Sequence, residues 1–401
     1  MARRKRLKRA PFPKLEPIGG VALGAIECGV AYRGRDDLML AVLDPGTAIA
    51  GVLTRSLSAS APVNWSRAML PGGRARAIVV NAGNANAFTG RDGDAIVQAT
   101  AARTAQIVGC LKKEVFVAAT GVIGQIFPAK KIPGKLAALH RRVRPDGWNA
   151  AAAAIMTTDT CPKGATRTAR IGDTTVIINA IGKGTQMIAP DLGTTLNFVF
   201  TDAKIPALAL HKMLVHAADR SFNCITLEGD TSTSDTLFLC ATGKARHRRV
   251  TAHNDPNLRD FRRALAEICL ALSHAIVRDS AGAARFVTLN VTGAASFKAA
   301  RKIGRVIGAS PLVKFALSNA LDPCGRIIMA VGKAGERANR DRLGIDIGGV
   351  VVAREGAVLR RHDAATVMAH LNGDDVNITI DVGIGRGRAT IWTSDRSVGY
   401  G

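Results

Sequence analysis

Apolar and polar positions alternate along this chain in short blocks whose lengths suit strands and helices in turn. Val, Ile, Leu and Ala dominate Gly20–Tyr32 and Leu38–Thr54, and the polar turn Arg33–Asp37 joins the two runs. Such runs, bounded by polar turns, predict strands. Asp44-Pro45-Gly46 marks a further turn that divides the second run into halves. The N-terminal part therefore reads as β-rich.

Later blocks alternate between the two periodicities, 3.6 residues for helices and 2 for strands. Helices are predicted over Asp94–Val108, Ala150–Met156, Pro206–Ala218, Leu258–Val277, Lys298–Ile307, Pro311–Ala320 and Ala364–Leu371. Strands are predicted over Arg76–Val80, Val115–Ala119, Leu196–Phe200, Thr236–Ala241, Phe286–Val291, Arg326–Val331, Ile345–Arg354, Val376–Val382 and Ala389–Thr393, with a hairpin over Arg167–Ile181. This alternation predicts an α/β (α+β) fold.

Composition adds a strong positive charge to this picture. The net charge is +24, and part of it lies in basic runs at residues 3–9, 141–144 and 244–249. Aromatic residues make up only 4% of the chain, whereas stacking-type nucleic-acid binders need aromatic platforms. A nucleic-acid partner is therefore not expected, and residues 1–16 are predicted to be a basic disordered tail. A positive field would also attract anionic metabolites.

Targeting and cysteine signals point to the cytoplasm. No apolar run reaches the length of a membrane span, and no compact apolar segment follows the basic N-terminus. The seven cysteines are odd in number and widely spaced, and none forms C-x-x-C. They read as reduced core thiols, and neither a metal site nor a membrane association is expected.

The Gly193–Thr194 bond stands directly before the apolar run Leu196–Phe200. A threonine hydroxyl needs a neighbouring base to act as a nucleophile, and chain cleavage before the threonine supplies its own α-amine as that base. Gly193 has no Cβ to obstruct attack on its carbonyl. Taken alone, the same residues also fit an ordinary turn into a buried strand.

Three further positions could complete an acyl-transfer site. Thr120-Gly121 follows a predicted strand and could present backbone N–H groups and a hydroxyl to an oxyanion, or simply end the strand. Lys183 could bind a substrate carboxylate, although a lone lysine is more often a surface charge. Thr157-Thr158-Asp159 could bind polar substrate groups or cap a helix.

Longer strings around these positions are specific. They are VVNAGNANAFTG (79–90), ATGVIG (119–124), IMTTDTCPK (155–163), KGTQMIAPDLGTTLNFVFTDA (183–203), GDTSTSDT (229–236), SPLVKFA (310–316) and MAVGKAG (329–335). From about Gly20 to Trp392 the chain closely resembles the self-cleaving ornithine acetyltransferase/glutamate N-acetyltransferase family of arginine biosynthesis.

The resemblance implies an architecture and a processing step. The fold would be the family's two-lobed α/β sandwich, of the ornithine acetyltransferase and DmpA-like type. The precursor would cut itself between Gly193 and Thr194, which gives an α chain over 17–193 and a β chain over 194–401. The cleaved chains would assemble as an α2β2 heterotetramer.

The resemblance also implies the reaction. Acetylornithine would acetylate the nucleophile Thr194, ornithine would leave, and glutamate would accept the acetyl group. Thr120 and Gly121 match the family's oxyanion-stabilising pair. Thr157, with Thr158 beside it, Lys183 and Thr194 match its substrate-binding positions. No cofactor is expected, although some members of the family accept acetyl-CoA as a substrate.

The chain departs from the family pattern around the substrate pocket. Where the family has a substrate-binding Glu, this sequence has Ala281, and it stops at Gly401 before the family's C-terminal Asn and Ser or Thr. Two alternatives therefore remain open beside acetyl transfer. The protein could be an N-terminal-threonine amidohydrolase or aminopeptidase, or a degenerate paralogue with reduced or altered activity.

Overall fold

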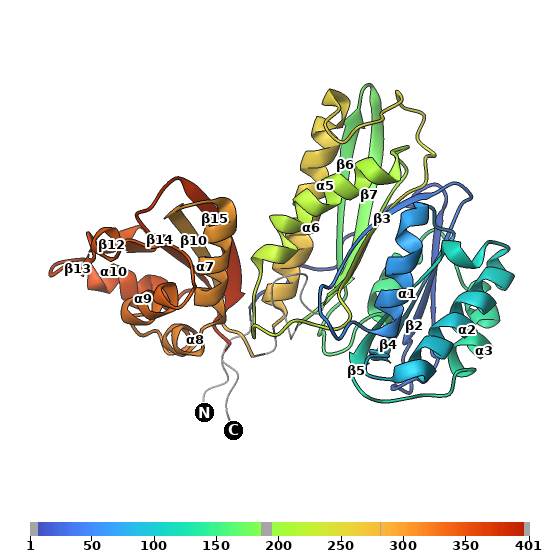
Figure 1. Cartoon of the computed structure of the whole chain (residues 1–401), viewed down its shortest axis with the longest axis horizontal. Helices are drawn as coiled ribbons and strands as arrows, with labels where there is room; N and C mark the ends of the chain where they lie inside the picture. Colours follow the sequence, from blue (N-terminus) through green and yellow to red (C-terminus); the bar gives the residue numbers. More distant parts are fainter. Residues whose placement is uncertain (1–6, 186–194, 281, 397–401) are drawn as a thin grey trace.

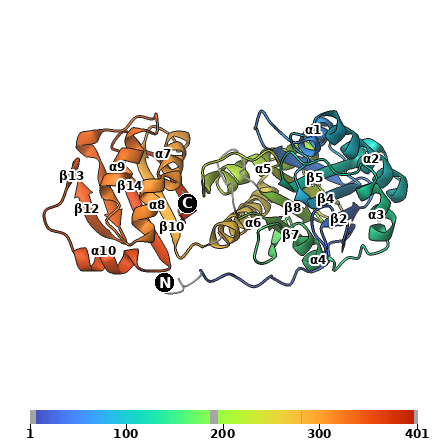
Figure 2. The same ribbon diagram turned by 90° about the horizontal axis from the view of Figure 1, so that it is seen from below.

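The structure is a computed structural model, and it describes residues 7–185, 195–280 and 282–396. Two lobes are visible, one holding the elements from β1 to α6 and the other those from β10 to β15 (Figures 1 and 2). The two-lobed α/β architecture expected from the sequence is thus confirmed.

Two sheets stack face to face in the first lobe. One has the order β1 (Val21–Ile26), β2 (Leu38–Leu43), β4 (Ala77–Asn84), β5 (Val115–Val122). The other has the order β3 (Ala48–Leu53), β9 (Thr236–Ala241), β8 (Leu196–Thr201), β7 (Thr174–Lys183), β6 (Lys163–Ile171). β4 and β5 run parallel, as do β8 and β9, so their carboxyl ends meet at common edges.

Apolar side chains fill the space between these sheets. Phe116 of β5 packs edge-on against Phe238 of β9, with ring centroids 5.3 Å apart. Leu196 and Phe198 of β8 belong to the same cluster, whereas Val199 faces the opposite side. The period of two along a strand explains this division, and it fixes which β8 side chains face the first sheet.

Helices cover the outer faces of both sheets. The first sheet is covered by α1 (Ala61–Met69), α2 (Gly90–Val108) and α3 (Lys131–His140), and the second by α5 (Ala207–Asp219) and α6 (Arg259–Arg278). α4 (Trp148–Ala154) joins the cluster between the sheets, where Trp148 contacts Phe200. The first lobe is therefore a four-layer αββα sandwich.

The second lobe has one mixed sheet with its own core. The strand order is β13 (Ala357–Val358), β12 (Val350–Arg354), β11 (Gly344–Ile347), β14 (Asp375–Asp381), β10 (Phe286–Ala294), β15 (Gly387–Ser394). Its helices are α7 (Phe297–Ala309), α8 (Pro311–Ser318), α9 (Cys324–Gly332) and α10 (Ala364–Leu371). Short 3-10 helices lie at Leu70–Gly72, Lys112–Glu114, Phe222–Cys224, Pro256–Leu258 and Arg340–Arg342.

Most predicted elements are present, with two kinds of error. The strand predicted over Arg326–Val331 is wrong, because these residues lie in helix α9. Its buried residues Ile327, Ala330 and Val331 have the spacing of one helix face, which the β-branched run conceals. Helices α1 and α3 have no counterpart among the predictions.

The N-terminal segment also differs from expectation. Residues 7–16, predicted to belong to a disordered tail, form neither helix nor strand, but Leu7 and Leu15 are buried. Leu7 packs in the core under α5 and α6, and Leu15 packs between the two sheets. Because two apolar side chains anchor it, this basic segment lies on the first lobe.

Candidate active site

Thr120 and Gly121 stand at the carboxyl end of β5, beside β4. Gly121 has φ of +130°, and a Cβ at this position would lie 2.1 Å from the carbonyl carbon of Gly83. Only glycine fits so close an approach in that backbone conformation. The Thr120 hydroxyl is buried beside this turn. The local geometry is thus a rigid, side-chain-free backbone turn with one adjacent hydroxyl.

Asparagines at the end of β4 and just beyond it hold this turn in place. Asn84 donates from Nδ2 to the carbonyl of Gln125 at 2.9 Å, and its Oδ1 accepts from the Asn86 backbone N–H at 2.7 Å. Asn81 in turn donates to the Asn84 carbonyl at 2.8 Å. These bonds connect the end of β4 to the segments that follow β4 and β5.

Lys183, at the end of β7, is buried rather than solvated. Its Nζ lies 2.8 Å from Thr157 Oγ1 and 3.3 Å from Thr120 Oγ1. The fold therefore gathers Thr120, Thr157 and Lys183, which come from three separate segments, around one ammonium group. Thr158 faces elsewhere, with its hydroxyl 2.6 Å from that of Thr185.

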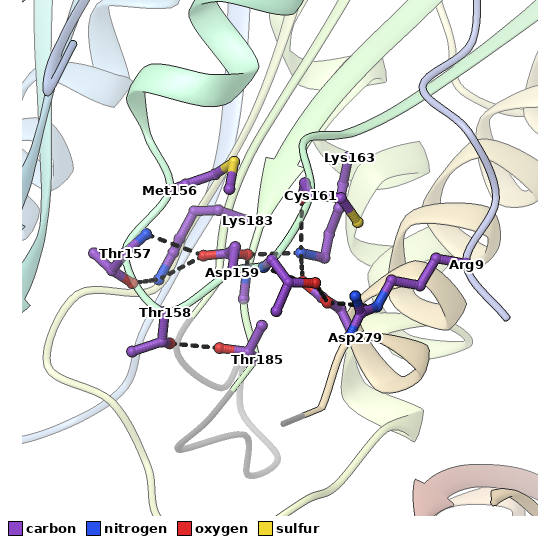
Figure 3. A network of polar contacts seen from close by, with 12 residues as sticks. Arg9, Met156, Thr157, Thr158, Asp159, Cys161, Lys163, Lys183, Thr185 and Asp279 are labelled. Atoms are coloured by element: carbon purple, nitrogen blue, oxygen red, sulfur yellow. Dashed lines mark hydrogen bonds and ion pairs between the residues drawn. The ribbon is translucent and has the colours of Figure 1, made fainter. Parts of the chain in front are cut away.

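Asp159 organises the same cluster (Figure 3). Its Oδ2 lies 3.8 Å from Lys183 Nζ and accepts from the Thr157 backbone N–H at 3.1 Å. Its Oδ1 accepts from the Gly184 backbone N–H at 2.7 Å and from Lys163 Nζ at 2.7 Å. One carboxylate thus links the loop that holds Thr157 to Gly184, the residue that follows β7.

The network continues away from Lys183 through alternating charges (Figure 3). Lys163 Nζ also lies 2.7 Å from Asp279 Oδ2, and both side chains are almost fully buried. Asp279 accepts from the Thr160 backbone N–H and hydroxyl, and Arg9 Nε lies 2.9 Å from its Oδ1. The N-terminal segment, β6 and the end of α6 are therefore tied to the site by charge.

Two pKa shifts follow from this arrangement. Burial opposes ionisation of Asp159, but Lys183 and Lys163 outweigh it and bring the pKa of that carboxyl down to about 2. Burial lowers the pKa of Lys183, and the Asp159 carboxylate partly offsets this effect. Asp159 therefore offsets part of the cost of burying the Lys183 ammonium group.

The predicted nucleophile is not among these contacts. Gly193, Thr194 and Ala281 all lie outside the described residues. The described chain resumes at Thr195, whose backbone N–H donates to Asp235 Oδ1 at 2.8 Å. Asp235 is fully buried directly before β9.

Sequence reasoning missed Lys163 and Asp279. Lys163 falls in a recognisable string, but nothing in its local pattern separates it from a surface lysine. Asp279 lies 116 residues away, and only the fold brings the two together. Asp279 immediately follows α6, and no other acidic residue lies between Glu267 and Asp322. This isolated acid was the one signal in the sequence that could have pointed to Asp279.

The cluster has the parts of an acyl-transfer site: an oxyanion-type turn, a buried cation and hydroxyl donors. Within residues 7–185, 195–280 and 282–396, no group of three His, Cys, Asp or Glu side chains could hold a metal ion. In the same part of the chain, no helix is both long and apolar enough to cross a membrane. All seven cysteines are unpaired.

Comparison with known proteins gives a consistent picture. The ArgJ family model matches residues 22–401. The arginine biosynthesis bifunctional protein ArgJ of Gluconobacter oxydans is 46% identical over 390 residues, covering 97% of this chain and 92% of that protein.

Two solved structures are also similar. A crystal structure of the ArgJ protein from Bacillus halodurans is 33% identical, with a TM-score of 0.48, and covers 51% of this chain and 94% of that chain. The ornithine acetyltransferase of Mycobacterium tuberculosis, complexed with ornithine, is 32% identical, with a TM-score of 0.40. The match covers 48% of this chain and 99% of that chain. On its sequence match over nearly the whole length, this chain belongs to the ArgJ family of arginine biosynthesis.

Proposed function

We propose that this protein is a self-processing acetyltransferase that moves an acetyl group from N2-acetylornithine to L-glutamate through an acetyl-threonine at Thr194. The observation that supports this most directly is the convergence of Lys183 on Thr120 and Thr157, at 3.3 and 2.8 Å. Donor and acceptor are both α-amino acids, so one buried cation can bind the carboxylate of each in turn.

The proposed self-cleavage uses the same site. Thr194 Oγ attacks the Gly193 carbonyl carbon, the C–N bond breaks, and the nitrogen takes the proton that the hydroxyl gives up. Water then hydrolyses the ester, which leaves a Gly193 carboxylate and a Thr194 with free hydroxyl and amine. The Thr120-Gly121 turn would stabilise the oxyanion of each tetrahedral intermediate.

In the transfer reaction the freed amine acts as base. It takes the Thr194 hydroxyl proton as Oγ attacks the acetyl carbonyl, and it returns this proton to the departing ornithine amine. The amine of glutamate then attacks the acetyl-threonine ester, and Thr194 leaves as a hydroxyl. Acetyl-CoA as a second donor and the α2β2 assembly belong to the same proposal and rest on the family assignment.

The test has two stages. Intact-mass spectrometry of the purified protein should show two fragments that meet at Gly193–Thr194, and T194A should give a single chain. Cut protein incubated with acetylornithine and glutamate should then produce acetylglutamate. A wild-type protein that stays uncut contradicts the proposal, and free acetate as the main product supports hydrolysis instead.

Position 281 provides a separate test of substrate binding. A carboxylate there could pair with the substrate ammonium group, and charge-assisted bonds of this kind contribute about 1.5–3 kcal/mol. A281E should therefore lower the KM for acetylornithine by about tenfold or more. An unchanged KM would show that other groups bind the ammonium in this protein.

A further inference from the structure

Residues 7–16 pass from one face of the second sheet of the first lobe to the other. Leu7 packs in the cluster under α5 and α6, whereas Leu15 packs in the cluster between the two sheets. Strand β6, which begins at Lys163, ends the strand order of that sheet. The segment therefore crosses beside β6, next to the lysine that pairs with Asp279.

Several contacts fix this segment in place. A Cβ at Gly164 would lie 2.7 Å from Phe12 Cε2, so the phenyl ring lies directly on the β6 backbone. Asn179 of β7 donates from Nδ2 to the backbone carbonyl of Glu16 at 2.7 Å. Together with the two buried leucines, these contacts hold the segment on both sides of Arg9.

Arg9 joins the network of ion pairs drawn in Figure 3. Its Nε lies 2.9 Å from Asp279 Oδ1, and 26% of its side chain is exposed, whereas the Asp279 side chain is inaccessible to solvent. The other carboxylate oxygen of Asp279 lies 2.7 Å from Lys163 Nζ. Asp279 therefore pairs with two cations at once, one on each oxygen.

The charges of this network do not cancel. Lys163 Nζ lies between the carboxylates of Asp159 and Asp279, at 2.7 Å from each. Lys183 is the second lysine, with its Nζ 3.8 Å from Asp159 Oδ2. These two cations and two anions balance, so Arg9 supplies one excess positive charge. Such an excess in a buried network attracts a carboxylate ligand to Lys183.

Asp235 also acts on the Lys183 ammonium group. Burial lowers the pKa of Lys183, and Asp235 is among the groups that oppose this effect. Burial in turn raises the pKa of Asp235 well above its ordinary value, which favours the uncharged form of that carboxyl. Asp235 therefore offsets the charge of Arg9 less than an ordinary carboxylate would.

We propose that Arg9 is a positioning residue whose ion pair with Asp279 leaves the Lys183 ammonium group free to bind the carboxylate of an α-amino-acid substrate. The inference rests on the proposed function, in which Lys183 binds that carboxylate. Without Arg9, Lys163 would be drawn toward Asp279 and away from Asp159. The Asp159 carboxylate would then pair more closely with Lys183, and substrate binding would weaken.

The test compares R9Q with K8Q. Both variants remove one positive charge from the same segment, but Lys8 is exposed. Isothermal titration calorimetry should give a dissociation constant for glutamate at least about fivefold weaker in R9Q, and within about twofold of wild type in K8Q. In the transfer assay R9Q should raise the KM for glutamate by a similar factor, with kcat nearly unchanged. R9K keeps the charge and should bind glutamate as the wild type does.

The outcomes separate positioning from a structural role. A wild-type dissociation constant in R9Q overturns the inference, even if stability or kcat falls, and so does an equal loss of affinity in K8Q. Wild-type protein that binds glutamate but makes no acetylglutamate contradicts the proposed function and leaves this comparison intact.

A second variant covers the case in which R9Q does not fold. R9H carries a cation at about pH 6 and loses it by about pH 8, so its affinity for glutamate relative to wild type should fall between these values. A ratio that stays constant over this range overturns the inference.

Discussion

Lys163 and Asp279 form a buried ion pair, with Nζ 2.7 Å from Oδ2 and both side chains nearly inaccessible to solvent. The pair joins β6 to the residue that follows α6, and position 281 lies two residues further on. Because Lys163 also bonds Asp159, the same ammonium group links the end of α6 to the carboxylate beside Lys183. The geometry of the candidate site is therefore coupled to the stability of the first lobe.

Removing one partner of this pair should be costly. K163M leaves two buried carboxylates without their shared cation, and a broken buried pair costs on the order of 3–5 kcal/mol. Urea unfolding followed by circular dichroism would measure the free energy of unfolding. E267Q, which breaks the exposed pairs of Glu267 with Arg263 and Arg167, is the control and should change it by less than about 1 kcal/mol. Equal stability of the two variants would contradict the prediction.

Asp159 should control the charge of Lys183. The carboxylate raises the pKa of the buried ammonium, so D159N should lower that pKa and let Lys183 lose its proton at a lower pH. The expected result is a higher KM for glutamate and a basic limb of kcat/KM that moves to lower pH. Steady-state kinetics across pH would measure both, and an unmoved basic limb would show that Lys183 is not the carboxylate-binding cation.

Gly121 should tolerate no side chain. In G121A the new Cβ would lie 2.1 Å from the Gly83 carbonyl carbon, so the oxyanion turn must move. Loss of one such donor typically lowers kcat about 10²–10³-fold, and both self-cleavage and transfer should fall by that order. Intact-mass analysis over time and a transfer assay would measure these rates.

The control for this change is G134A, in helix α3. A Cβ at Gly134 meets nothing within 4 Å, and Ala is the better helix former there. G134A should therefore cut and transfer as the wild type does. A G121A protein that did the same would remove the turn from the mechanism.

Asp235 should reduce stability as pH rises. Its pKa in the folded protein is raised well above the ordinary 3.8, so the unfolded chain gives up this proton first. The folded state therefore loses stability as pH increases from about 4 toward the folded pKa. D235N does not titrate, and its free energy of unfolding relative to wild type should increase from pH 4 to pH 7. A constant difference in urea unfolding at the two pH values would contradict this.

Local sequence patterns predicted much of the fold and part of the candidate site. The hairpin over Arg167–Ile181 was predictable because turn residues act over a few positions. The same holds for Thr120-Gly121, where a strand end and a glycine suffice to mark a backbone turn. Helix α9 was mistaken for a strand because a short β-branched run does not reveal which neighbours will bury it.

The sequence by itself determined the family, the alternation of strands and helices, and the candidates Thr120, Lys183 and Thr194. Only the tertiary structure decided that Lys183 is buried against Thr120 and Thr157, and that Lys163 pairs with Asp279. It also showed that basic residue Arg9 contacts a buried carboxylate rather than solvent alone. The physical reason is that burial and charge pairing depend on contacts between residues far apart in the chain, which no local pattern records.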